Sequence, residues 1–167
     1  MIKETKIRLS SVLRNDSKRS KIAMDDYGWC DISELCRIQQ FNRQDISEVV
    51  KEYEDLFSVD GNKIRINRGH NFKCKVGLKE ANPPDVLYYV TGYKMASKIM
   101  KQGLKQSESF IRLDIDKKEL KVKSPDNLVY IEVNAKQMKE DGIVFYQNNV
   151  PDIYLTDDID KKYLKTV

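Results

Sequence analysis

The sequence predicts an α+β protein in two parts, with helices and a hairpin in the first part and a mostly antiparallel sheet in the second. Three observations lead to this prediction: helical spacing of apolar residues before residue 60, strand-rich segments after residue 85, and tandem prolines between them. Pro83 and Pro84 cannot lie inside a helix or a central strand. We therefore expect one domain over residues 1–80, a linker over residues 81–84 and a second domain over residues 85–167.

The first domain is expected to contain three helices followed by a β-hairpin. A weak helical pattern covers residues 4–14, Asp31 is the expected N-cap of a second helix, and apolar residues at a three-four spacing predict a third over residues 43–56. Asp60 and Gly61 then predict a turn between strands at residues 57–59 and 63–66. This is the order of a winged-helix unit, a fold found in many nucleic-acid-binding proteins, and the order alone does not establish binding.

The second domain is expected to be rich in strands. Strands are predicted at residues 86–91, 110–114, 128–133, 143–146 and 152–155. A short helix is predicted from residue 94 to residue 100, with Gly103 ending it, and another over residues 135–140. This pattern favours a mostly antiparallel sheet with helices.

The bulk composition of the 167 residues excludes several classes of protein. No apolar run approaches the roughly 18 residues that a membrane span needs, and the charged N-terminus lacks the apolar segment of a signal peptide. The three cysteines have no CxxC spacing, and the single histidine excludes metal sites that need two imidazoles. We therefore expect a cytoplasmic or nuclear protein that is not secreted, with reduced cysteines, no metal and no membrane association.

Two basic stretches stand out against a chain of net charge +4. Residues 1–21 hold seven Lys/Arg and two acids, and residues 63–79 hold six Lys/Arg and no acid. The rest of the chain is therefore net acidic. Charge this local predicts a site for an anion, most plausibly phosphate, and the alternative is two solvated basic surfaces.

Arg65, Arg68 and His70 lie within six residues of one another, just after a predicted strand. The planar guanidinium of arginine suits phosphate oxygens, and an imidazole can donate a hydrogen bond or carry a proton. Gly69 would allow the backbone to approach a ligand. The alternative is a basic loop with a surface histidine.

Trp29 is interpreted as a core residue of the first domain.

The motifs in chain order resemble those of the KptA-type RNA 2′-phosphotransferases over nearly the whole length. The matching pieces are Leu9-Ser10…Val12-Leu13-Arg14, Tyr27-Gly28-Trp29…Asp31…Glu34-Leu35, Asp60-Gly61…Ile64-Arg65-Ile66-Asn67-Arg68-Gly69-His70, Pro83-Pro84…Leu87-Tyr88-Tyr89-Val90-Thr91, Gly103-Leu104, Ile131-Glu132-Val133-Asn134-Ala135…Met138…Gly142, Phe145-Tyr146 and Tyr154-Leu155-Thr156…Tyr163-Leu164. No single piece is specific, and the resemblance depends on their order and spacing.

The resemblance implies a winged-helix lobe joined to an ADP-ribosyltransferase-like lobe, with the active site in a cleft between them. It implies a monomeric enzyme that removes an internal 2′-phosphate from RNA, typically at the splice junction of a tRNA. NAD⁺ is the co-substrate, the phosphate leaves as ADP-ribose cyclic phosphate, and no metal is needed.

The resemblance also assigns residues. Arg14, Asn15 and Arg65 take the catalytic positions, and Arg68, His70 and Lys123 are expected to contact the substrate phosphate or RNA. Tyr88, Tyr89, Thr91 and Arg112 are expected to hold NAD⁺.

Several of these positions depart from the family pattern. Asn15, Tyr89 and Arg112 stand where the family has histidine, and Val90 replaces a glycine of the NAD⁺ motif. The segment that supplies the last family arginine is shortened, so that Lys121 or Lys123 stands in for it. Two alternatives to the enzyme therefore remain open. One is a binding protein of the same fold that holds RNA or an ADP-ribose-like ligand without turnover, and the other is an ADP-ribosyltransferase with another acceptor.

Overall fold

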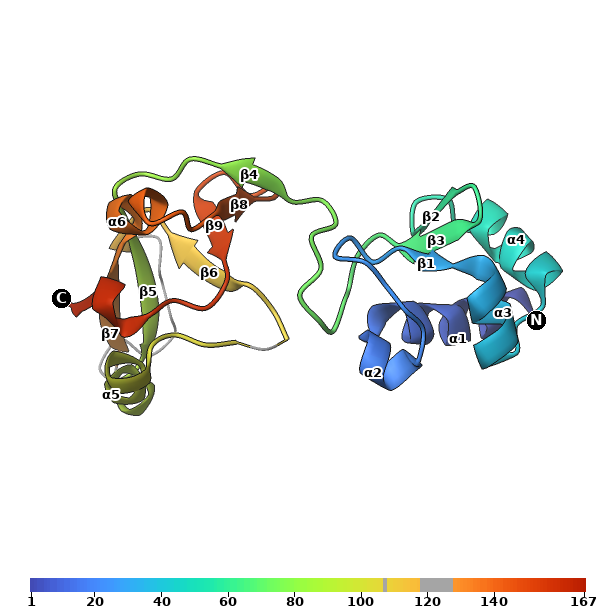
Figure 1. Cartoon of the computed structure of the whole chain (residues 1–167), viewed down its shortest axis with the longest axis horizontal. Coiled ribbons are helices and arrows are strands. Elements are labelled where there is room, and N and C mark those ends of the chain that lie inside the picture. Colours follow the sequence, from blue (N-terminus) through green and yellow to red (C-terminus); the bar gives the residue numbers. More distant parts are fainter. Residues whose placement is uncertain (107, 118–127) are drawn as a thin grey trace. The chain divides into compact units, whose positions relative to one another are not determined.

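The computed structural model describes residues 1–106, 108–117 and 128–167, and it divides into two compact units (Figure 1). The first unit is Met1–Gly77 and the second is Leu78–Val167. Each unit has its own cluster of buried apolar side chains. Both contain helices and antiparallel strands, so the predicted α+β class is confirmed.

The first unit combines helices with a small antiparallel sheet. Its helices are α1 (Ile2–Arg14), α2 (Ser17–Ser20), α3 (Ile32–Gln39) and α4 (Arg43–Glu52). Its strands are β1 (Cys30–Asp31), β2 (Phe57–Asp60) and β3 (Lys63–Ile66), in the order β1-β3-β2. β2 and β3 form the hairpin predicted from Asp60 and Gly61. Leu9 and Leu13 of α1, Leu35 of α3 and Val49 of α4 are fully buried in one core with Ile64 of β3.

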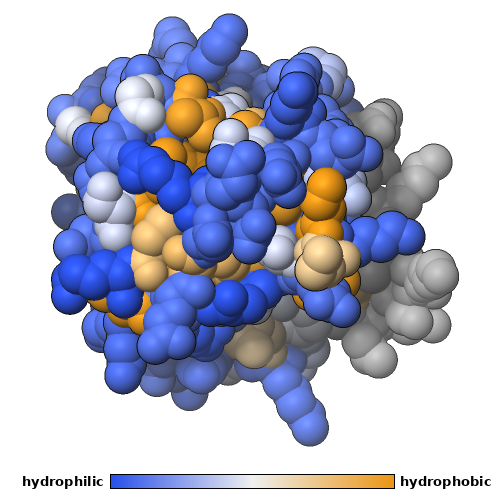
Figure 2. Space-filling view, turned by 90° about the vertical axis from the view of Figure 1, so that its right-hand side faces the viewer, coloured by the Kyte–Doolittle hydropathy of each residue, from blue (hydrophilic) through white to orange (hydrophobic). Residues whose placement is uncertain are grey.

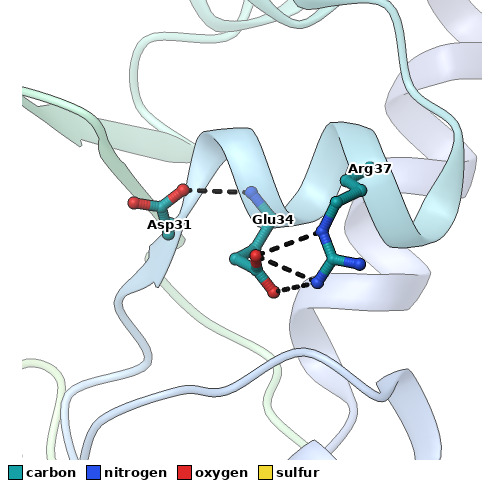
Figure 3. A network of polar contacts seen from close by, with 3 residues as sticks. All are labelled: Asp31, Glu34 and Arg37. Atoms are coloured by element: carbon teal, nitrogen blue, oxygen red, sulfur yellow. Dashed lines mark hydrogen bonds and ion pairs between the residues drawn. The ribbon is translucent and has the colours of Figure 1, made fainter.

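The start of α3 confirms the predicted N-cap. The side chain of Asp31 accepts a hydrogen bond from the backbone N–H of Glu34 at 3.0 Å (Figure 3). This bond stabilises the carboxylate and holds the pKa of Asp31 below its ordinary value. Glu34 in turn accepts from Arg37 at 2.8 Å, one turn further along the helix. Such an exposed pair adds only a few tenths of a kcal/mol, about 0.2–0.5.

The helix predicted over residues 43–56 ends earlier, at Glu52. Tyr53 leaves the helical region with a φ of −123°, and its carbonyl accepts from the backbone N–H groups of Leu56 at 3.0 Å and Phe57 at 3.2 Å. Phe57 already pairs with Ile66 in the hairpin. The three-four spacing of apolar residues therefore extends beyond the end of α4. It continues through the turn that leads from Tyr53 into the paired strands of the hairpin.

The surface of α4 is not basic. Arg43 and Lys51 are outnumbered on this helix by Asp45, Glu48 and Glu52, and all five side chains are exposed. Figure 2 views the molecule from the side on which α3 and α4 are drawn in Figure 1, and hydrophilic residues cover most of that face, with apolar groups between them. The excess positive charge of the first unit therefore lies outside α4.

The second unit is built on one antiparallel sheet with two helices. The strands are β4 (Lys79–Ala81), β5 (Val86–Gly92), β6 (Ile111–Asp114), β7 (Leu128–Asn134), β8 (Phe145–Gln147), β9 (Ile153–Thr156) and β10 (Leu164–Thr166). Their order is β10-β7-β5-β6-β9-β8-β4. The helices are α5 (Tyr93–Gln102) and α6 (Ala135–Glu140), with a short 3₁₀ helix, η3 (Lys161–Tyr163), before β10.

Register decides which side chains share a face of this sheet. Leu87 pairs with Val133 and Tyr89 with Ile131, and these four belong to or pack against the core that Ala96 and Ile99 of α5 complete. Tyr88 lies opposite Asp114 of β6 and Glu132 of β7. Because side chains alternate along a strand, Tyr88 faces away from this core, and Arg112, two residues from Asp114, does so too.

The domain boundaries differ from those expected. The compact units divide after Gly77, whereas the sequence pointed to residue 80. Lys79–Ala81 forms β4 and pairs with β8, so the expected linker, residues 81–84, starts inside the sheet of the second unit. Pro83 is also buried. The strand that pairs with β4 lies over 60 residues further along the sequence, and no local sequence pattern predicts this pairing.

Candidate functional site

The residues that follow β3 lie against the C-terminal end of α1 and are hydrogen-bonded to it. The backbone N–H of Asn71 donates to the carbonyl of Arg14, the last residue of α1, at 2.8 Å. Arg14 Nε donates in return to the carbonyl of Arg68 at 3.4 Å. Gly69 has a φ of +82°, and a Cβ at this position would lie 2.7 Å from Arg14 Nε. Glycine is therefore required here both by the backbone conformation and by the space that Arg14 occupies.

Arg65 lies on β3 and stacks on an indole ring. Its guanidinium carbon is 4.5 Å from the ring centroid of Trp29. The turn before Trp29 is held by Asp25, whose carboxylate accepts from the backbone N–H groups of Tyr27 at 2.9 Å and Trp29 at 3.0 Å. Arg65 Nε is buried without a hydrogen-bond partner. Trp29 is half-buried outside the core cluster, so its interpretation as a core residue is wrong, and its ring orients Arg65 instead.

His70 is a half-buried residue of this loop, and its surroundings disfavour a positive charge on the ring. Burial, followed by the nearby guanidinium groups of Arg14 and Arg65, lowers the pKa of His70 below the ordinary 6.5. A hydrogen bond with the backbone of Ile66 opposes this shift. His70 Nε2 is buried without a partner, and a Cβ added to Gly28 would lie 3.0 Å from it. The charged imidazole is therefore disfavoured, and the ring packs against Gly28.

The depressed pKa of His70 predicts how stability depends on pH. The unfolded chain takes up a proton near pH 6.5, whereas the folded chain does so only at lower pH, so the unfolded state binds more protons in between. The free energy of unfolding should therefore fall as the pH drops below 6.5. Denaturant melts between about pH 7 and pH 5.5 measure this slope. The variant His70→Gln should flatten it, and an unchanged slope would show that His70 is not the group responsible.

Arg14 and Arg65 carry positive charges that no acidic side chain of the described residues offsets. Among the described residues neither has a carboxylate within ion-pair distance. Arg68, by contrast, pairs with Asp55 at 3.5 Å, and both of these side chains are largely exposed. Two guanidinium groups close enough to His70 to lower its pKa, with no carboxylate partner in the described part of the chain, form a cationic site suited to an oxyanion.

Asn15 is expected to be catalytic, and the structure shows what its side chain contacts. Asn15 Nδ2 donates to the carbonyl of Ser11 at 2.9 Å, and Asn15 Oδ1 accepts from Asn71 Nδ2 at 3.1 Å. Both ends of the amide are thus engaged with the protein itself.

The residues expected to hold NAD⁺ divide between the two faces of the second sheet. Tyr89 and Thr91 line a cavity of about 480 Å³ beside α5, together with Lys98, Gln102 and Lys105. Tyr88 and Arg112 lie on the opposite face, where Lys117 Nζ is 5.4 Å from the ring centroid of Tyr88. The structure therefore brings Tyr89 and Thr91 together and separates them from Tyr88 and Arg112. Lys121 and Lys123 lie outside the described residues.

Sequence reasoning missed three kinds of contributor. Asn71 and Gly69 hold Arg14, Trp29 supports Arg65, and Lys98 and Lys105 bring positive charge to the cavity. The lysines carry no signal in a chain so rich in lysine. Gly69 was noted for a possible close approach of its backbone to a ligand, and the structure shows in addition that Arg14 Nε occupies the space beside it.

Two further features are absent from the described part of the chain. No group of three or more histidine, cysteine or carboxylate side chains there is placed to hold a metal ion. No helix there has the length and apolar character that crossing a bilayer requires.

Comparisons with known proteins agree with an anion-binding protein and specify its family. A family model described as "RNA 2′-phosphotransferase, Tpt1 / KptA family" matches residues 4–158. A probable RNA 2′-phosphotransferase of Flavobacterium johnsoniae is 34% identical over 170 residues, which cover 94% of this chain and 92% of that protein. Another, from Trichormus variabilis, is 32% identical, covering 93% of this chain and 91% of that protein. The chain belongs to the RNA 2′-phosphotransferase family, and the resemblance noted in its sequence is confirmed.

Proposed function

We propose that this protein is an NAD⁺-dependent RNA 2′-phosphotransferase that removes an internal 2′-phosphate from RNA. The observation that carries the proposal is the pair of guanidinium groups, Arg14 and Arg65, held in place without a carboxylate partner among the described residues. Family membership supplies the substrate: the relatives are named RNA 2′-phosphotransferases. The RNA is proposed to be a tRNA with a 2′-phosphate at its splice junction.

Arg14 and Arg65 would bind the 2′-phosphate. Each guanidinium can present two parallel N–H groups to phosphate oxygens, and both are fixed on their other side, one by a backbone carbonyl and one by an indole ring. Groups already oriented towards developing charge need no rearrangement during reaction. The two arginines would therefore stabilise negative charge on the phosphoryl oxygens throughout the transfer. The transfer itself would leave a 2′-hydroxyl on the RNA.

The helices and hairpin of the first unit follow the order of a winged helix, and we propose that this unit contacts the RNA. In helix-turn-helix proteins the second helix of the motif enters the major groove. The helix in that position here, α4, is net acidic and exposed, which disfavours the same mode of binding. RNA contacts would instead centre on the end of α1 and on residues 65–71, where the unpaired arginines lie.

NAD⁺ would bind the second unit, which we propose to be ADP-ribosyltransferase-like. The cavity beside α5 offers an aromatic ring at Tyr89, a hydroxyl at Thr91 and two lysines, and no acidic residue is among those that line it. This set of groups fits a nucleotide with a diphosphate. NAD⁺ would supply the ADP-ribose: a 2′-phosphate oxygen would displace nicotinamide from the ribose carbon, and transesterification would then transfer the phosphoryl group from the RNA 2′-oxygen to a ribose hydroxyl, giving ADP-ribose cyclic phosphate and an RNA 2′-hydroxyl.

A second candidate function is a binding protein of the same fold that retains RNA without turnover. A specific observation favours it: Asn15 replaces a family histidine and has both ends of its amide engaged, while burial and the nearby guanidinium groups disfavour the charged form of His70 and lower its pKa. An ADP-ribosyltransferase acting on another acceptor remains a third reading.

A single-turnover assay separates these functions. The protein is mixed in excess with a short RNA that carries one ³²P-labelled internal 2′-phosphate, with and without NAD⁺. NAD⁺-dependent release of label as ADP-ribose cyclic phosphate is the expected result. Label that stays on RNA which is still bound would favour the binding protein, and label on an ADP-ribosylated RNA would indicate that the transfer stops after its first step.

A further inference from the structure

Two asparagine side chains, 56 positions apart in the sequence, form a hydrogen-bonded pair beside the candidate phosphate site. Asn71 Nδ2 donates to Asn15 Oδ1 at 3.1 Å, and Asn15 Nδ2 donates to the carbonyl of Ser11 at 2.9 Å. The pair therefore fastens the loop after β3 to the last turn of α1. No sequence pattern singles out Asn71. Asn15 directly follows Arg14, the candidate phosphate ligand.

This pair does not act alone, because the backbone of Asn71 makes a second attachment. Its N–H donates to the carbonyl of Arg14, one of the helix-terminal carbonyls that α1 itself cannot satisfy. Backbone and side chain of Asn71 thus bind two consecutive residues, Arg14 and Asn15. A segment tied at both points has little freedom to move away from the helix end.

The fastened segment in turn holds the side chain of Arg14. The carbonyl of Arg68, three residues before Asn71, accepts from Arg14 Nε at 3.4 Å, and Gly69 lies against the same nitrogen. With Nε engaged, the terminal nitrogens of the guanidinium remain for an oxyanion. If the loop moved, Arg14 would lose this carbonyl and regain the rotamers of a long, flexible side chain, and ordering it again would weaken ligand binding.

We propose that Asn15 and Asn71 are positioning residues which hold the 68–71 loop on α1 and so fix the guanidinium of Arg14 for a phosphate. The proposal rests on the proposed function, since it takes Arg14 as a phosphate ligand. It gives Asn15 a role different from that of the histidine which the family has at this position. In this proposal the Asn15 amide fixes the position of Arg14 and does not contact the reacting phosphate.

The test is a double-mutant cycle on binding. The dissociation constant is measured for a short single-stranded RNA with one internal 2′-phosphate and for the same RNA without it, and the ratio reports the phosphate contribution. Asn15→Ala and Asn71→Ala should each reduce that ratio about 5-fold, the equivalent of one hydrogen bond. The variant carrying both changes should lose no more than either alone. In an Arg14→Ala background, neither change should have any further effect.

Asn62→Ala is the matched control. Asn62 Nδ2 donates to Asp31 Oδ2 at 2.9 Å and to Ser33 Oγ at 3.2 Å, so this change also removes side-chain hydrogen bonds from the first unit but leaves the end of α1 intact. It should lower thermal stability without changing the phosphate ratio. If one of the two asparagine variants fails to fold, the other still forms a cycle with Arg14→Ala, which tests the positioning role from the helix side or from the loop side.

The outcomes distinguish the proposal from the function on which it rests. If Arg14→Ala leaves the phosphate ratio unchanged, Arg14 is not a phosphate ligand and the proposed function fails with it. If Arg14→Ala lowers the ratio, but the asparagine changes are harmless or cost the same with and without Arg14, only the positioning role is overturned.

Discussion

Replacing Arg65 by alanine should remove most of the affinity for a 2′-phosphorylated RNA and lower turnover by about 10²–10³-fold. Loss of one oriented, charge-assisted contact to the reacting group accounts for an effect of this size. Arg65→Lys should recover little of it, because an ammonium keeps the charge but has neither the planar fork nor the stacking on Trp29. Single-turnover rates and RNA dissociation constants measure both effects.

Three further readouts make the Arg65 prediction specific. The logarithm of affinity should depend less steeply on the logarithm of salt concentration, by about 0.7, the value of one phosphate contact to a single strand. The pKa of His70, the one histidine of the chain, should rise, because Arg65 is among the causes that lower it. Stability should fall only by the loss of the stacking contact with Trp29, since Arg65 Nε makes no hydrogen bond in the folded protein. Arg37→Ala, which removes an exposed arginine paired with Glu34, is the control and should alter none of the three. If affinity and turnover are unchanged in Arg65→Ala, the site formed by Arg14 and Arg65 does not take part in the proposed function.

Gly103→Ala should destabilise the second unit by about 3 kcal/mol or more. Gly103 ends α5 with φ 86° and ψ 174°, a region that only glycine adopts without strain. A Cβ there would lie 2.6 Å from the carbonyl oxygen of Ile159. That carbonyl cannot simply move, because Leu104 and Ile159 exchange two backbone hydrogen bonds of 2.8 Å each. The melting temperature of this unit should fall by roughly 15 °C.

Two observables assign the Gly103 effect to the correct unit. Trp29 is the one tryptophan of the chain and lies in the first unit, so its fluorescence follows that unit, whereas far-ultraviolet circular dichroism follows both. The dichroism should show an early transition that the fluorescence lacks. Gly142→Ala is the matched control: its φ of 88° is equally left-handed, but a Cβ would meet nothing within 4 Å. Equal losses in the two variants would mean that backbone conformation alone, and not the contact with Ile159, sets the cost.

Local signals in the sequence were sufficient for most helices and strands. The N-cap at Asp31, the hairpin turn at Gly61 and the end of α5 at Gly103 each depend on residues within a few positions, and the structure confirms them. Two short strands that the sequence did not predict depend on distant partners, whereas the unpredicted helix α2 is capped locally by Asp16. β4 exists because it pairs with β8, and β10 because it pairs with β7. The end of α4 was missed for the same reason, since the hairpin determines where the helix stops.

The candidate site was predictable in its charges and not in its geometry. Two basic stretches far apart in the sequence pointed to Arg14, Arg65 and His70, and the structure brings Arg14 and the loop of His70 together through hydrogen bonds. What sequence could not supply is the set of neutral partners. A pairing of Asn15 with Asn71, or of Trp29 with Arg65, follows from the fold and has no local pattern. The roles assigned to the individual site residues remain predictions.

Selection can act on the two units separately, because each buries its own apolar side chains. A substitution that weakens one unit need not unfold the other, and distant substitutions are expected to add nearly independently. A lineage can therefore lose the chemistry of one half by small steps while the other half stays folded and continues to be selected for binding.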